Sequence, residues 1–159
     1  MSLTLHLGDE AATTALGAAA ARCLPTAAQP FVVELAGDLG AGKTTFARGL
    51  LRELGVSGQI RSPSYALLET YDAGGWQVLH LDLYRLLDPE ELENLGVRDY
   101  HDGRCLWLVE WPGKGEGYLP RADARLEFAS GATEHTVTLA AQGAAGAAWI
   151  AALNPDTGS

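Results

Sequence analysis

A glycine-rich run between residues 37 and 44 constrains the fold of this chain more than any other feature. The run reads Gly37-Asp38-Leu39-Gly40-Ala41-Gly42-Lys43-Thr44. It fits the pattern GxxxxGK[ST], the P-loop that binds nucleotide phosphates. The apolar residues 31–36 predict a buried strand before the loop, and residues 45–54 predict a helix after it that ends at Gly55.

A strand, a glycine-rich turn and a helix N-terminus together direct several backbone N–H groups at an anion. Glycine lets the backbone curl around phosphate because no Cβ is in the way. Lys43 then supplies a positive charge for the β- and γ-phosphates, and the hydroxyl of Thr44 is a ligand for Mg²⁺. A chance glycine-rich loop is the alternative, and the strand and helix on either side argue against it.

The size and composition predict a soluble, single-domain protein. A chain of 159 residues can bury a sizeable core. No apolar run approaches the roughly 20 residues of a membrane span, and the N-terminal residues show no signal-peptide pattern. Cys23 and Cys105 form no CxxC motif and lie among apolar residues, so we expect buried free thiols in a reducing cytoplasm.

The charge balance bears on the choice of partner. Twenty acidic residues against eleven basic ones give a net charge of −9. Such a surface repels a polyphosphate backbone, and the basic residues form no block along the chain. We therefore expect a protein partner rather than direct binding of a nucleic acid. The alternative is that the acidity serves only solubility.

Apolar patterning predicts the remaining strands. Strands are expected at residues 3–7, 66–71, 76–83, 105–110, 124–129 and 136–140. Residues 66–71 and 76–83 form a hairpin around a turn at 72–75, and the last two strands form another. The nearly continuous apolar run 105–110 indicates a central strand that is covered on both faces.

Capping signals predict three further helices. Asp9 caps a helix that runs to about residue 24. Residues 88–96 form a short helix with Asp88 at the N-cap and Pro89 at its first position. The segment 141–159 is rich in Ala and Gly, and we expect a short helix around Trp149 and Ile150 followed by a frayed tail.

Two carboxylates stand where apolar strands end, as a P-loop site requires for its metal ion and its attacking water. Glu110 ends the strand 105–110, and Asp82 lies near the end of 76–83. The alternative for each is a structural carboxylate that pairs with an arginine such as Arg85. His80 is interpreted as a packed residue rather than a base.

Two further positions stay open on residue types alone. Ser64 follows the P-loop helix where many P-loop proteins place a γ-phosphate switch, but an ordinary Ser-Pro turn explains the stretch 62–65 better. Trp111 is either a packing anchor or an aromatic residue near the nucleotide.

Taken in order, these motifs resemble the TsaE (YjeE) family, small bacterial ATPases of the tRNA threonylcarbamoyladenosine pathway. The matching stretches span roughly residues 31 to 120. They are the P-loop with Thr45-Phe46, Ser62-Pro63-Ser64-Tyr65, His80-Leu81-Asp82-Leu83-Tyr84-Arg85, Asp88-Pro89-Glu90-Glu91-Leu92-Glu93 with Gly96, and Val109-Glu110-Trp111-Pro112.

The resemblance implies an α/β fold, a P-loop NTPase-like sheet with added antiparallel strands and flanking helices. We take residues 1–140 as the P-loop ATPase domain and 141–159 as an Ala/Gly-rich C-terminal helix and frayed tail. The resemblance implies ATP and Mg²⁺ as ligands. The implied nucleotide-binding residues are Gly37, Asp38, Leu39, Gly40, Ala41, Gly42, Lys43, Thr44 and Thr45.

The resemblance also assigns roles to individual residues. Lys43 grips phosphate, Thr44 and Glu110 hold Mg²⁺, and Asp82 is essential for ATP turnover. Ser64 occupies a switch position that is usually Thr in the family. The implied partners are TsaB and TsaD, with TsaD the transferase, and ATP is thought to reset their complex between turnovers.

Two rival functions remain from the motifs. A small-molecule or nucleoside kinase needs a second substrate pocket and a lid, and residues 121–125 are too short for one. A nucleotide switch that docks without hydrolysis is disfavoured by Asp82 and Glu110. We expect weak ATPase activity from the isolated chain, because no residue stands out as an arginine finger. The alternative is that Arg61 or Arg85 serves as that finger in cis.

Overall fold

A single mixed sheet organises the molecule. The computed structural model describes residues 2–38, 40–60, 63 and 66–154. Within these residues, seven strands form one sheet in the order β1-β7-β6-β2-β5-β4-β3. The bounds are β1 Ser2–Leu7, β2 Phe31–Gly37, β3 Leu68–Ala73, β4 Trp76–Asp82, β5 Cys105–Glu110, β6 Ala124–Ser130 and β7 His135–Ala141.

The centre of the sheet is parallel and its edges are antiparallel. β6, β2, β5 and β4 run parallel to one another, whereas β3, β7 and β1 are added antiparallel. The predicted hairpins β3–β4 and β6–β7 are confirmed. All six residues of β5 are buried, which confirms a central strand that is covered on both faces.

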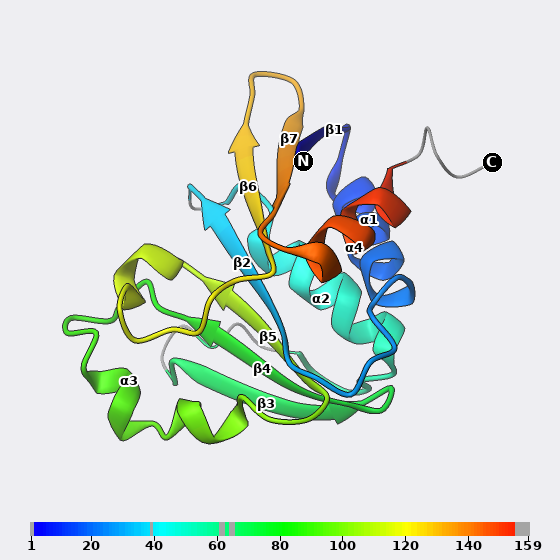
Figure 1. The fold of residues 1–159 in the computed structure, drawn as a ribbon. Coiled ribbons are helices and arrows are strands. Elements are labelled where there is room, and N and C mark those ends of the chain that lie inside the picture. Colours follow the sequence, from blue (N-terminus) through cyan, green and yellow to red (C-terminus); the bar gives the residue numbers. More distant parts are fainter. Residues whose placement is uncertain (1, 39, 61–62, 64–65, 155–159) are drawn as a thin grey trace.

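Helices cover both faces of this sheet (Figure 1). α1 (Glu10–Arg22), α2 (Lys43–Leu54) and α4 (Ala144–Leu153) lie on one face. The short α3 (Glu91–Asn94) and the 3₁₀ helix Val97–Tyr100 lie on the other. None of these described helices is long and apolar enough to cross a bilayer.

The C-terminal helix α4 packs on the same core as α1 and α2. The Trp149 ring meets Phe31 edge to face, with centroids 5.3 Å apart. Its indole N–H donates a hydrogen bond of 3.0 Å to the Ala20 carbonyl. The helix that we expected around Trp149 and Ile150 is therefore present, and both side chains are buried.

Among the differences from the sequence prediction, one concerns a helix and one a cysteine. The helix predicted at 88–96 is α-helical only over Glu91–Asn94, with Glu90 and not Asp88 at its N-cap. The hydrogen bonds at its start link residues three apart, so Asp88 and Pro89 belong to a tighter turn. Cys105 is buried as expected, but Cys23 is partly exposed.

Two glycines let α1 and α2 approach closely. A Cβ on Gly49 would overlap the carbonyl oxygen of Thr14, and a Cβ on Gly17 would overlap that of Phe46. Glycine in mid-helix lowers intrinsic helix stability by about 1 kcal/mol relative to alanine. The close crossing therefore explains a residue choice that helix propensity alone opposes.

The helix crossing predicts that Gly49→Ala destabilises the protein by about 1–3 kcal/mol, because the new methyl forces backbones apart. Chemical denaturation monitored by circular dichroism measures the change. Arg48→Ala, at the neighbouring exposed position of α2, is the matched control and should stay within about 0.5 kcal/mol. A Gly49→Ala variant as stable as the parent contradicts this packing.

Candidate functional site

The P-loop joins β2 to α2 and depends on its glycines. Gly37, Gly40 and Gly42 all have positive φ angles, of 128°, 77° and 115°, in the region that favours glycine. A Cβ on Gly37 would also overlap the carbonyl oxygen of Phe128 in β6. Gly42 is the N-cap of α2. The helix thus begins at Lys43, two residues before the predicted start, and its N-terminus faces the loop.

Lys43 is buried against the loop that precedes it. Its ammonium donates hydrogen bonds to the carbonyl oxygens of Gly37 and Asp38, at 2.6 and 2.8 Å. Burial lowers the pKa of Lys43, while the negative charges of Glu110, Asp82 and Asp38 act in the opposite direction. The positive charge of this lysine is therefore held at the mouth of the P-loop among carboxylates.

Both candidate carboxylates lie beside the P-loop. β4 and β5 pair so that Asp82 lies opposite Glu110, and these side chains are 5% and 2% exposed. The Thr44 hydroxyl donates to Glu110 Oε1 at 3.1 Å. Asp82 Oδ1 accepts a hydrogen bond of 3.1 Å from the backbone N–H of Tyr84. The parallel sheet thus brings the two carboxylates to the edge where α2 presents Thr44.

The aromatic residue after Glu110 contacts the P-loop lysine. Lys43 Nζ lies 4.5 Å from the centroid of the Trp111 ring, a distance that allows a cation–π interaction. Trp111 has a positive φ of 59°, and its ring packs 5.0 Å from that of Tyr84. The Trp111 ring thus packs between Tyr84 and the lysine of the glycine-rich loop, and a position near a nucleotide stays a prediction.

His80 is buried, as predicted, but it also contacts the site. Its Nε2 lies 2.6 Å from Glu110 Oε2. The sequence interpretation missed this contact, although one signal was available. His80 precedes Asp82 by two residues on the same strand, and such residues share a face of the sheet.

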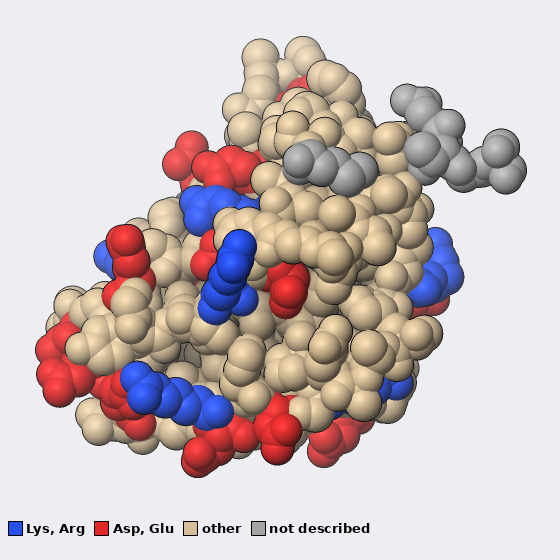
Figure 2. All heavy atoms as spheres, viewed as in Figure 1, with Lys and Arg blue, Asp and Glu red and all other residues tan. Residues whose placement is uncertain are grey.

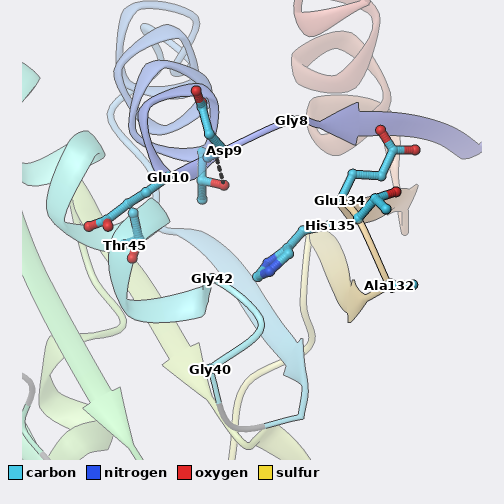
Figure 3. A pocket seen from close by; sticks show the side chains of 12 residues that line it. Gly8, Asp9, Glu10, Gly40, Gly42, Thr45, Ala132, Glu134 and His135 are labelled. Carbon is cyan, nitrogen blue, oxygen red and sulfur yellow. Dashed lines mark hydrogen bonds between the residues drawn. The ribbon is translucent and has the colours of Figure 1, made fainter.

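A pocket opens on the other side of the P-loop (Figure 3). Its volume is about 470 Å³, and it is lined by the α1 N-terminus, the P-loop and the β6–β7 turn. In Figure 3, His135 extends from that turn towards the loop, where its Nδ1 lies 3.1 Å from the carbonyl oxygen of Ala41. Asp9, Glu10 and Thr13 contribute from α1. No sequence motif pointed to these residues, because they come from segments far apart in the chain.

The structure does not describe every predicted position. Leu39, Arg61 and Ser64 lie outside the described residues, so their predicted roles stay predictions. Arg85 is exposed on the loop after β4. The described residues therefore assemble Lys43, Thr44, Glu110 and Asp82, with Trp111 and His80 in contact with members of this group.

Known proteins share this arrangement of sequence and fold. The family model for the threonylcarbamoyl adenosine biosynthesis protein TsaE matches residues 7–138. A Haemophilus influenzae protein named tRNA threonylcarbamoyladenosine biosynthesis protein TsaE is 46% identical over 124 residues, 77% of this chain and 78% of that one. A Bacillus subtilis protein of the same name is 37% identical over 70% of each chain.

The comparison of folds indicates the same family. The crystal structure of Bacillus subtilis YdiB superposes with a TM-score of 0.75 at 29% identity, over 96% of this chain and 94% of that one. The P-loop motif, the mixed sheet and these matches agree with the resemblance that the motifs indicated. The chain belongs to the TsaE family, whose members are named for tRNA threonylcarbamoyladenosine biosynthesis.

Proposed function

We propose that this protein binds and hydrolyses ATP with Mg²⁺ and is required for the threonylcarbamoyladenosine modification of tRNA. In this proposal it acts in the cytoplasm on the TsaB–TsaD complex and resets that complex between turnovers. The observation that supports it most is the convergence of Lys43, Thr44, Glu110 and Asp82 on one P-loop in a chain of the TsaE family.

The phosphate site is built from backbone and one lysine. Residues at the start of α2 present N–H groups that lack partners within the helix, and these groups bind anions. Lys43 lies at the loop mouth, where its ammonium can exchange the carbonyl oxygens of Gly37 and Asp38 for phosphate oxygens. A phosphate is the better partner, because it carries a full negative charge.

The donor set fits Mg²⁺. Thr44 and Glu110 offer a hydroxyl and a carboxylate oxygen within 3.1 Å of each other, and both are the hard oxygen ligands that Mg²⁺ prefers. Among the described residues, no three His, Cys, Asp or Glu side chains gather to form a metal cage. This suits a cation that is held by one or two protein groups together with substrate phosphates. When bound, Mg²⁺ would neutralise charge on the phosphates.

The pocket beside the P-loop suits the nucleoside part of ATP. The pocket and the P-loop region share three residues, Gly40, Gly42 and Thr45. A ligand whose phosphates are bound at the P-loop would therefore extend into this pocket. Its volume of about 470 Å³ is that of a small-molecule site. The His135 contact with Ala41 ties the β6–β7 turn to the loop and closes this side of the site.

Asp82 is the residue that we assign to turnover. It is buried beside Glu110, and its carboxylate can accept a hydrogen bond from the attacking water and orient it. Glu110 already uses one oxygen for Thr44 and the other for His80. The two carboxylates thus have different surroundings and, in this proposal, different roles.

The surface favours a protein partner over tRNA. The net charge is −9, and on the face shown in Figure 2 the basic side chains are interspersed with acidic ones. A surface of this kind lacks the contiguous positive charge that binds a nucleic acid backbone. The proposal therefore gives TsaB and TsaD, and not tRNA, as the direct contacts.

Nucleotide binding is the first expected outcome. ATP with Mg²⁺ at a hundredfold excess over its dissociation constant should stabilise the protein by about 2.7 kcal/mol, seen as a higher melting temperature. Lys43→Ala should lose most of this shift because it removes the positive charge at the loop. No shift in the parent, or an equal shift in the variant, contradicts the assignment.

Substitution of each carboxylate should have a different effect on nucleotide binding and hydrolysis. Glu110→Gln should weaken the Mg²⁺ dependence of nucleotide affinity, because an amide oxygen is a poorer ligand than a carboxylate. Asp82→Asn should leave nucleotide affinity near that of the parent and lower the rate of phosphate release. Calorimetry and a phosphate-release assay without any acceptor measure both effects, and the reverse pattern would exchange the two roles.

Partner dependence is tested by phosphate release from the protein alone and with TsaB and TsaD. We expect slow release alone and acceleration by the two proteins, since a group supplied in trans accelerates other P-loop enzymes by about 10³–10⁵. Addition of tRNA alone is the control and should have no effect. Full activity in isolation, or stimulation by tRNA alone, would argue against a partner-gated ATPase.

A further inference from the structure

A buried histidine contacts the carboxylate that the proposed function gives to the metal. His80 and Glu110 are 1% and 2% exposed, and His80 Nε2 lies 2.6 Å from Glu110 Oε2. The two residues stand on neighbouring strands, β4 and β5. Their contact is therefore set by the sheet and not by a surface loop.

The hydrogen of this contact belongs to the histidine. A carboxylate oxygen only accepts, so we assign the hydrogen to Nε2. Nδ1 is then a bare acceptor, and among the described residues it finds no hydrogen-bond partner. One nitrogen of the imidazole donates a hydrogen bond to Glu110, and the other has no hydrogen-bond partner among the described residues.

Glu110 is held at both oxygens. Oε2 accepts from His80, and Oε1 accepts from the Thr44 hydroxyl at 3.1 Å. A carboxylate with one donor can rotate about its last side-chain bond, whereas two donors on opposite oxygens fix its plane. The histidine therefore fixes the orientation of the Glu110 carboxylate relative to Thr44.

We propose that His80 is a positioning residue that orients Glu110 towards Thr44 for binding of a divalent cation. This inference rests on the proposed function of the site. Groups behind a metal ligand typically fix its orientation, and their loss lowers metal affinity by about 10–100-fold. His80 stands in that relation to Glu110.

A purely structural role explains His80 less well. A buried polar ring with one unpartnered nitrogen lowers stability, and an apolar residue of similar volume avoids that loss. On the same face of the sheet, Val78 and Leu108 beside His80 are apolar and buried, whereas Asp82, Glu110 and Glu69 are acidic. The ring donates to Glu110, and its Nδ1 finds no partner among the described residues, so the contact with Glu110 explains a histidine at this position better than packing does.

Three substitutions separate orientation from packing. His80→Gln can place an amide N–H near the position of Nε2, whereas His80→Asn places it near Nδ1 and out of reach of Glu110. His80→Leu removes the donor entirely. His101→Asn, an exposed histidine outside the site, is the matched control.

The measurement is the affinity for a non-hydrolysable ATP analogue, adenylyl imidodiphosphate, as Mg²⁺ is titrated, with an EDTA baseline. We expect His80→Leu and His80→Asn to need about tenfold more Mg²⁺ for half of the effect. Their affinities in EDTA should match that of the parent. His80→Gln should recover most of the Mg²⁺ response, and His101→Asn should behave as the parent.

The remaining outcomes can be told apart. If the parent shows no Mg²⁺-dependent binding, the proposed function fails, and the role of His80 fails with it. If the parent responds and the Leu and Asn variants respond equally, only the role of His80 fails. A loss of affinity that is the same with and without Mg²⁺ shows a structural role. If the Leu variant does not fold, the contrast between Gln and Asn decides.

Discussion

Parallel pairing of β2, β5 and β4 is the constraint on which the site depends. The register sets Leu35 beside Glu110 and Glu110 beside Asp82, so the three strands end at one edge of the sheet. Paired residues project to the same face, which directs both carboxylates towards α2 and Lys43. A shift of one residue in the register of β4 or β5 would point its carboxylate to the opposite face of the sheet, where the buried side chains are apolar.

This arrangement concentrates buried charge in a small volume. Lys43, Asp82 and Glu110 are each at most 5% exposed, and the lowered pKa of Lys43 shows that burial outweighs the attraction of the nearby carboxylates. Apolar residues at such positions are often equally or more stabilising. The cluster is therefore typical of a functional site, held in place by apolar layers on both faces of the sheet.

Local patterns accounted for much of the fold. The Asp9 cap, the two hairpins and the buried strand β5 were predicted from neighbouring residues, because each depends on chemistry within one turn or on a period of two. The short helix α3 was predicted too long. Asp88 and Pro89 suit the start of a helix as well as a tight turn, and local preference alone does not distinguish these two structures.

The sequence by itself determined the glycine-rich loop between a strand and a helix and the two strand-end carboxylates, since spacing along a single segment carries those signals. Only the tertiary structure decided that His80 contacts Glu110, that Trp111 packs on Lys43 and that His135 reaches the P-loop. Thr44 and Glu110 are 66 residues apart, and His135 and Ala41 are 94 apart. Contacts over such separations depend on strand order and register, which no local pattern encodes.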